Sequence, residues 1–140
     1  MSRIWLFSDG SVNTQSNVGF GAYVMVSEDA ALEAPETLHV KVKEFTQTSS
    51  TKLELQTLLW ALDEVKESAD EIIIYTDSQN IITLPSRKER FERMGYETKQ
   101  KKLHAHTALY QVFFRVMDEM KCSLVKVKGH KLTRDKDAID

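Results

Sequence analysis

The pattern of apolar and polar positions changes its period along this chain. In the first 45 residues, short runs of strand type cover about 3–9, 18–27 and 38–45. The third run alternates apolar residues with His39, Lys41 and Lys43, which predicts an edge strand with its valines buried and its lysines in water. Polar residues at 10–17 predict a turn between the first two strands, and residues 28–36 read as a loop.

After about Thr51 the apolar positions follow helical spacing, as in Leu55, Leu58 and Leu62. The run at 71–76 is apolar on both faces, which predicts a central strand covered on two sides. A short helix is expected after Asp77, ending before Pro85. An amphipathic helix is predicted at 106–120 and a last strand at 124–128, and residues 135–140 could begin another helix. This order of elements predicts an α/β fold with a mixed sheet and helices on its faces.

The length of 140 residues predicts a single domain over 1–140. Its hydrophobic content of 41% and charged content of 29% are those of a soluble protein. No apolar run approaches the roughly 20 residues of a membrane span, and the first residues do not resemble a signal peptide. Cys122 is the only cysteine, which excludes an internal disulfide and suits the reducing cytosol. We therefore expect a cytoplasmic protein with no membrane partner, and a monomer.

The net charge of −2 does not by itself indicate a nucleic-acid-binding protein. The charge is unevenly distributed, however. Residues 87–102 hold seven basic and three acidic side chains, so this stretch carries +4 and the rest of the chain must carry −6. The stretch is either a solvated helix face or a phosphate-binding surface, and the sequence leaves both open.

Two aspartates lie at predicted strand ends. Asp9 shares a strand face with Trp5 and Phe7, where a carboxylate is a poor choice unless a cation meets it. The alternative is a plain Asp–Gly turn. Asp77 follows the buried strand at the edge where open α/β sheets place their sites. Its alternative role is to cap the next helix, for which Ser78 would serve equally well.

Glu54 lies on the predicted helix that comes between these aspartates in the sequence. Thr51 to Glu54 fits a capping box, in which the glutamate binds the first backbone amide of the helix. The same residue is in register with the apolar stripe, so it should face the sheet. Several carboxylates gathered at one sheet end need cations to stay ionised, and oxygen ligands favour Mg²⁺ or Mn²⁺ over zinc. One cysteine and four scattered histidines also argue against zinc.

Four short blocks resemble the signatures of the type 1 ribonuclease H family, in the family's order and spacing. They are Phe7-Ser8-Asp9-Gly10-Ser11, Thr51-Lys52-Leu53-Glu54-Leu55, Tyr75-Thr76-Asp77-Ser78-Gln79 and Val127-Lys128-Gly129-His130. The resemblance covers essentially the whole chain. It implies a five-stranded mixed sheet, with an antiparallel meander of three strands, two further parallel strands and helices on both faces. It also implies endonucleolytic cleavage of the RNA strand of RNA–DNA hybrids, leaving 5′-phosphate and 3′-hydroxyl ends.

The resemblance also assigns roles to residues. It implies that Asp9, Glu54, Asp77 and Asp140 hold two Mg²⁺ ions, for which Mn²⁺ could substitute, with Asp137 as the alternative fourth ligand. His130 would move protons or help the product leave. The residues expected to contact the hybrid are Gly10, Ser11, Asn13, Ser49, Ser50, Gln79, Lys99, Lys101 and Lys102.

The chain also departs from the family. Ser50 and Thr51 stand where two asparagines are common, and their hydroxyls can still hydrogen-bond a sugar or a base edge. Asn13 or Gln15 would take the phosphate-loop role. The sequence given stops at Asp140, where the family continues into a terminal helix, so that helix is expected to be lacking. Two alternatives stay open: a nuclease of this fold with another substrate, or a nucleic-acid-binding module without activity.

Overall fold

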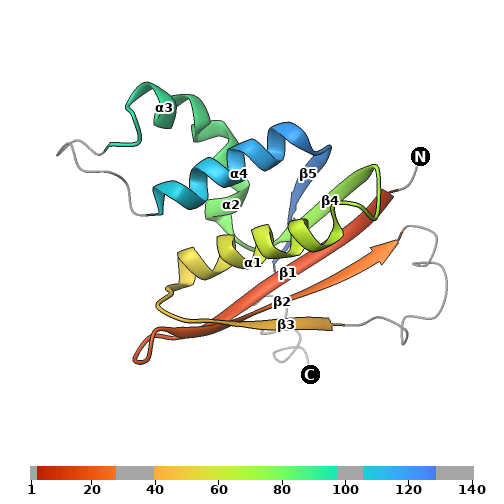
Figure 1. Cartoon of the computed structure of the whole chain (residues 1–140), viewed down its shortest axis with the longest axis horizontal. Helices are drawn as coiled ribbons and strands as arrows, with labels where there is room; N and C mark the ends of the chain where they lie inside the picture. The colour runs from red at the N-terminus through yellow and green to blue at the C-terminus, as the bar shows by residue number, and fades with distance from the viewer. Residues whose placement is uncertain (1–2, 28–39, 98–105, 129–140) are drawn as a thin grey trace.

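The computed structural model describes residues 3–27, 40–97 and 106–128, and five strands of these residues form one sheet in the order β3-β2-β1-β4-β5. β1, β2 and β3 are antiparallel neighbours, whereas β4 and β5 run parallel to β1 (Figure 1). The predicted mixed sheet with a meander at one side is therefore confirmed, and β3 is an edge strand. The strands are β1 Arg3–Asn13, β2 Val18–Ser27, β3 Val40–Phe45, β4 Glu71–Thr76 and β5 Cys122–Lys126.

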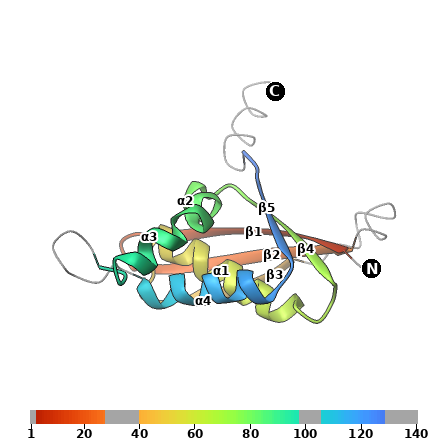
Figure 2. The ribbon, with the colours of Figure 1, turned by 90° about the horizontal axis from the view of Figure 1, so that it is seen from above.

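The two longest helices, α1 and α4, pack on the same face of this sheet (Figure 2). Three short helical segments follow the carboxyl end of β4 and add Ile81, Leu84 and Phe91 to the same core. No described helix is long and apolar enough to cross a membrane. The helix expected at 135–140 lies outside the described residues. The helices are α1 Ser50–Val65, α2 Gln79–Thr83, the 3₁₀ helix η3 Leu84–Arg87, α3 Lys88–Arg93 and α4 Thr107–Glu119.

Strand alternation decides which side chains form the core. Ile4 and Leu6 of β1 point toward the helices, as do Ile72 and Ile74 of β4, and none of the four is more than 2% exposed. They meet the apolar stripe of α1 and the fully buried Phe113 of α4. Burying each large apolar side chain stabilises the fold by about 1.5–3 kcal/mol, so this layer holds the helices to the sheet.

Three glycines let α1 approach the sheet closely. A methyl group at Gly10 or Gly19 would lie 2.9 or 2.7 Å from Cδ2 of Leu53. At Gly21 it would lie 2.0 Å from Oγ1 of Thr57. Because these glycines are on β1 and β2, the first half of α1 rests directly on the strand backbone. Because glycine has no side chain, these three positions determine how closely α1 approaches β1 and β2.

The structure corrects the predicted turn at 10–17. β1 continues through Gly10 to Asn13, which pairs with Val18 of β2. Only residues 14–17 form the turn, where Asn17 has a φ of 57° and its N–H donates to the Asn13 carbonyl at 2.8 Å. The polar residues at 10–13 were misleading, because cross-strand hydrogen bonds of the backbone hold this part of β1.

The predicted faces of the third strand are also wrong. Val40 and Val42 are 62% and 60% exposed, whereas Lys41 and Lys43 lie on the face that carries α1. Lys41 forms an ion pair with Glu64 at 3.5 Å, and Lys43 lies over the ring of Trp60. At the edge of the sheet the long lysine stems pass beside the helix and their ammonium groups stay in water. On the opposite face no described helix covers the valines.

The other helix and strand boundaries differ from the predicted ones by a few residues. The last strand covers 122–126 rather than 124–128, and the predicted helix at 106–120 is α4. The strand at 71–76 agrees with β4, although β1 rather than β4 is the middle strand of the five. No clear sequence pattern predicted η3 and α3, which are only four and six residues long.

Candidate active site

Asp9 and Asp77 lie just beyond the same end of the pairing between two parallel strands, although Asp9 is inside β1 rather than at the strand end that the sequence had predicted. The pairing of β1 with β4 runs from Arg3↔Glu71 to Phe7↔Tyr75, and each aspartate follows the last pair by two positions. The rings of Phe7 and Tyr75 stack at 4.8 Å between centroids, which fixes the register just before the aspartates. Both acidic residues therefore follow the paired part of β1 and β4 on the same side of the molecule.

Asp9 is exposed, and its Oδ1 accepts a hydrogen bond from the Gly10 N–H at 2.8 Å. Because β1 continues as a strand beyond Gly10, the alternative of an Asp–Gly turn is wrong. The carboxylate is therefore held at a point where the strand surface is open to solvent.

Glu54 approaches this sheet end from α1. The N-cap of α1 is Ser49, whose Oγ accepts the Lys52 N–H at 3.4 Å, so the predicted capping box from Thr51 is wrong. Glu54 is half-buried, as its place on the margin of the apolar stripe predicted, and its Oε1 accepts a hydrogen bond from Ser78 Oγ at 3.2 Å. Its neighbour Leu53 packs on Gly10. Glu54 is thus tied to the residues that follow both Asp9 and Asp77.

Ser78 is the N-cap of α2. Its Oγ accepts the Ile81 N–H at 3.1 Å, and its own N–H donates to Oγ1 of Thr76 at 3.1 Å. Of the two predicted caps, Ser78 is therefore the one the helix uses. Capping does not explain the presence of Asp77, which is half-buried beside it.

The donor set of these three residues is entirely carboxylate oxygen, which is the set that Mg²⁺ and Mn²⁺ prefer. Among the described residues, no group of three His, Cys, Asp or Glu side chains is gathered closely enough to hold a metal ion. Asp9 and Glu54 instead accept hydrogen bonds from the protein. The structure thus brings the three acidic residues to one sheet end, in a chemistry that fits a divalent ion, without gathering their carboxylates into one cluster.

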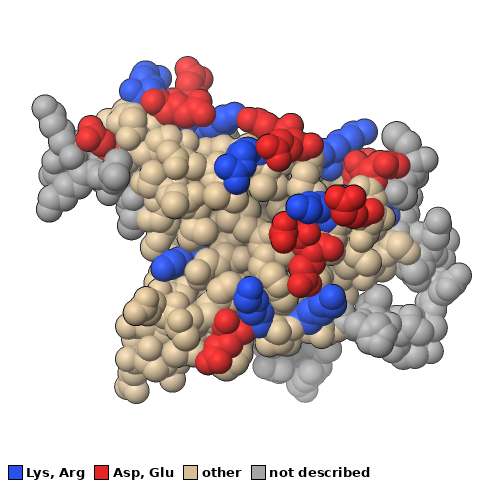
Figure 3. Space-filling view, viewed as in Figure 1, with Lys and Arg blue, Asp and Glu red and all other residues tan. Residues whose placement is uncertain are grey.

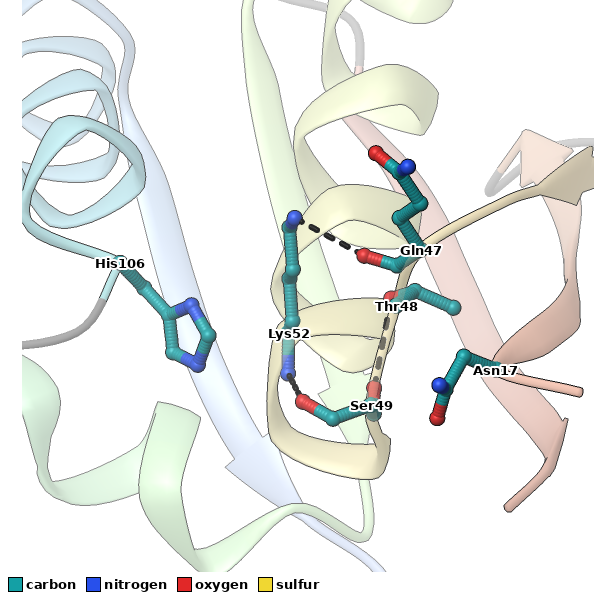
Figure 4. Close-up of a pocket in the computed structure, with 6 residues that line it drawn as sticks. All are labelled: Asn17, Gln47, Thr48, Ser49, Lys52 and His106. Carbon is teal, nitrogen blue, oxygen red and sulfur yellow. Dashed lines mark hydrogen bonds between the residues drawn. The ribbon is translucent and has the colours of Figure 1, made fainter. Parts of the chain in front are cut away.

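An open pocket of about 330 Å³, lined by residues with polar side chains, lies beside the N-terminus of α1 (Figure 4). Lys52 Nζ donates to the Gln47 carbonyl at 3.1 Å, and the Thr48 N–H donates to the Asn17 carbonyl at 2.9 Å. These bonds join the β1–β2 turn to the segment before α1. The lining residues are Asn17, Gln47, Thr48, Ser49, Lys52 and His106.

His106 closes the pocket from the start of α4 (Figure 4). Burial of the imidazole, and next the positive charge of Lys52, lower the pKa of His106 from its ordinary value. The ring is therefore neutral at pH 7. Lys52 remains the cationic group among the residues that line the pocket, with its ammonium group at the Gln47 carbonyl and its backbone N–H at the hydroxyl of Ser49.

Comparison with known proteins decides the family. A model of the RNase H family matches residues 1–140. This chain belongs to the RNase H family. It is 26% identical over 137 residues to a ribonuclease H from Syntrophomonas wolfei subsp. wolfei, covering 93% of this chain and 86% of that protein. Its fold is similar to a chain in the structure of the foamy viral protease-reverse transcriptase in complex with dsDNA. That match has a TM-score of 0.68 and 11% identity over 90% of this chain and 80% of that one.

The resemblance carried by the four sequence blocks is therefore confirmed at the level of family and fold, and this ribonuclease H is a nuclease and a hydrolase. Of the residues expected to contact substrate, Gly10, Ser11 and Asn13 lie on β1. Asn13 Oδ1 accepts the N–H groups of Gln15 and Ser16, at 2.9 and 3.2 Å, and so shapes the turn.

The other expected contact residues lie at helix starts. Ser49 and Ser50 are exposed at the beginning of α1, beside the pocket. Gln79 is the exposed first residue of α2, and its Oε1 accepts a hydrogen bond from Lys126 Nζ at the end of β5. His130, Asp137 and Asp140 lie outside the described residues, as do Lys99, Lys101 and Lys102.

The described part of the basic stretch in this ribonuclease H is not a cationic patch. Residues 87–97 contain four basic and three acidic side chains, so their net charge is +1. The other +3 of the net charge of +4 over residues 87–102 comes from the three lysines beyond 97. Figure 3 shows both signs interspersed over the upper part of this face, while the β1–β2 hairpin at the lower left carries almost no charge. Near the pocket, contacts of the hairpin with a ligand must therefore be polar rather than ionic.

Sequence reasoning missed the link from Ser78 to Glu54, and it missed Gln47, Lys52 and His106 as lining residues of one pocket. The pocket residues come from three segments that are far apart in the sequence. The nearest signal in the sequence was the alternative role of Ser78 as the cap of the next helix, which is confirmed but gives no indication of the bond to Glu54.

Proposed function

We propose that this ribonuclease H hydrolyses the RNA strand of RNA–DNA hybrids in a metal-dependent reaction that leaves 5′-phosphate and 3′-hydroxyl ends. The observation that carries the proposal is the position of Glu54. Its hydrogen bond to Ser78 and the packing of Leu53 on Gly10 tie it to the residues that directly follow Asp77 and Asp9. Three acidic residues from three elements therefore converge where a phosphodiester can reach them from solvent.

Asp9, Glu54 and Asp77 would hold two Mg²⁺ ions, or Mn²⁺ in their place, together with Asp140. Two divalent ions supply an activated water and neutralise the charge that develops on the phosphate and on the leaving oxygen. Asp9 is the most exposed of the three and lies on the middle strand, just beyond the part that pairs with β4, so it is the best placed to contact both ions. His130 would move protons or assist product release.

The polar pocket supports a role in holding one strand of the hybrid. Lys52 is fixed to the Gln47 carbonyl, so its ammonium group stays at the pocket, where it would meet a backbone phosphate with one positive charge (Figure 4). Lys99, Lys101 and Lys102 would hold further phosphates. Such contacts do not read sequence, and binding should weaken steeply with salt.

Selection of RNA over DNA requires a group that recognises the sugar 2′-hydroxyl. Ser50 is exposed at the first turn of α1 and Gln79 at the first turn of α2, so each flanks Glu54 on one side. Together with Gly10, Ser11 and Asn13 on β1, they would contact the sugar and the groove of the hybrid.

The test is incubation with an end-labelled RNA–DNA hybrid, duplex RNA and duplex DNA, each with Mg²⁺ or with EDTA. We expect cleavage of the hybrid alone, only with Mg²⁺, and products that a kinase labels after phosphatase treatment of their 5′ ends. Cleavage of a duplex but not the hybrid would mean another substrate, and binding without cleavage would mean a binding module.

A further inference from the structure

Ser78 lies between Asp77 and Gln79 and is only 4% exposed, yet its hydroxyl reaches the half-buried Glu54 on another element. We propose that Ser78 is a positioning residue that orients the Glu54 carboxylate for metal binding. This proposal rests on the proposed function, because it assumes that Glu54 is a metal ligand. It concerns a residue that touches neither the substrate nor the metal itself.

The direction of the Ser78 hydroxyl proton follows from its hydrogen bonds. A serine hydroxyl has one proton to donate and two lone pairs. Oγ accepts the Ile81 N–H at 3.1 Å, so one lone pair is already directed at α2. The remaining partner is Glu54 Oε1 at 3.2 Å. An ionised carboxylate can accept hydrogen bonds but cannot donate them, so the serine proton points at the carboxylate. The N-cap of α2 therefore sets the orientation of the donor.

The backbone of Ser78 is equally constrained. Its N–H donates to Oγ1 of Thr76, a side chain that is 3% exposed at the end of β4. A donor fixed at both its main chain and its side chain holds the carboxylate in one place. The bond to Glu54 joins α1 to the β4–α2 connection, so it couples the position of Glu54 to that of Asp77.

This bond changes what Glu54 can do. A glutamate has three rotatable side-chain bonds, and ordering them upon metal binding costs conformational entropy. The Ser78 bond restricts that freedom beforehand. It occupies one of about four lone-pair positions of the carboxylate. Groups that orient metal ligands in this way typically contribute 10- to 100-fold to metal affinity or activity.

The test compares Ser78→Gly, Ser78→Thr and Ser78→Asn with the wild type. Glycine is nearly as good an N-cap as serine, so Ser78→Gly removes the donor with little loss of capping. Threonine keeps the hydroxyl, and asparagine can both accept the Ile81 N–H and donate an amide proton to Glu54. Mn²⁺ affinity is measured by calorimetry on the full chain, the Mg²⁺ dependence of hybrid cleavage by initial rates, and the melting temperature in EDTA.

We expect Ser78→Gly to weaken Mn²⁺ binding about 10- to 100-fold and to raise the half-saturating Mg²⁺ concentration similarly. Ser78→Thr should stay within about threefold of the wild type, and Ser78→Asn should recover part of the loss. A purely structural role of Ser78 would lower the melting temperature in EDTA without changing metal affinity, and that result overturns the proposal. If the wild type and Ser78→Gly bind Mn²⁺ with equal affinity, the role of Ser78 is wrong but the proposed function stands. If the wild type binds no Mn²⁺, the proposed function is wrong as well.

Discussion

Replacing Gly21 by alanine should strongly destabilise this protein, because the new methyl group has no room beneath α1. It would lie 2.0 Å from Oγ1, 2.8 Å from Cγ2 and 2.9 Å from Cβ of Thr57. Thr57 is 1% exposed and branched at Cβ, so its side chain cannot rotate away. Gly21 lies on β2, between two hydrogen-bonded strands, so the strand cannot yield easily either.

The magnitude follows from the cost of overpacking a core. Extra methyl groups in tightly packed sites cost about 1–3 kcal/mol, and the short contact with Thr57 places this one near about 3 kcal/mol. For a domain of this size, that free energy corresponds to a decrease in melting temperature of about 10 °C. Because α1 must move outward, Glu54 should move with it, and hybrid cleavage should fall even at temperatures where the variant is folded.

The assay is thermal unfolding followed by circular dichroism, with initial rates of cleavage measured well below the transition. Thr57→Ala is the matched second change, since it removes both atoms nearest the new methyl group and a hydroxyl that has no hydrogen-bond partner in the described structure. The double variant should recover most of the lost stability. A Gly21→Ala variant that melts within 2 °C (about 0.5 kcal/mol) of the wild type would show that α1 does not approach β2 this closely.

Three further predictions concern single side chains. Asp9→Asn should abolish hybrid cleavage while leaving the melting temperature in EDTA unchanged or slightly higher, because a negative charge is removed from an end of the sheet that also carries Glu54 and Asp77. Burial, and next the hydrogen bond to Glu64, raise the pKa of Tyr23 to about 12. The corresponding stability is fully present below the ordinary pKa of 10 and is lost as the pH rises toward 12, and Tyr23→Phe should remove this loss in denaturant titrations at pH 9–12. Burial raises the pKa of the Cys122 thiol to about 11, so a thiol-reactive dye should label it far more slowly in buffer than in denaturant at pH 8.

Each of these predictions has a result that contradicts it. Full activity of Asp9→Asn would remove Asp9 from the metal site. An equal loss of stability above pH 10 in Tyr23→Phe would assign that loss to other groups. Labelling of Cys122 at the same rate with and without denaturant would show that the thiol is accessible in the folded protein.

The sequence predicted which residues share a face, but not which face the helices cover. For β4 this makes no difference, because the strand is apolar on both faces and either face suits a helix layer. In the structure Ile72 and Ile74 are the ones buried under the helices. For β3 they differ. Val40 and Val42 alternate correctly with the lysines, yet the helix layer lies on the lysine side. Nothing in a six-residue alternation encodes on which side of an edge strand α1 passes.

The candidate site was predictable to the extent that each acidic residue could be assigned to an element, although β1 continues beyond Asp9 to Asn13. Asp9 and Asp77 could be placed from strand patterns, and Glu54 from its helical register. The hydrogen bond from Ser78 to Glu54 spans 24 residues and joins two side chains that each had a sufficient local explanation as a cap. Long-range partners of this kind leave no periodic signal, so they require the folded structure.

The pocket beside α1 also has consequences for attempts to improve this protein. Asn17, Gln47 and His106 line it with left-handed backbones, at φ of 57°, 50° and 68°. Such conformations in residues other than glycine cost of order 1–3 kcal/mol each. Glycine would relieve that cost and remove the side chains that form the pocket wall. Directed evolution for heat resistance alone would therefore favour glycine here, so a selection for a robust enzyme must also select for hybrid cleavage at every round.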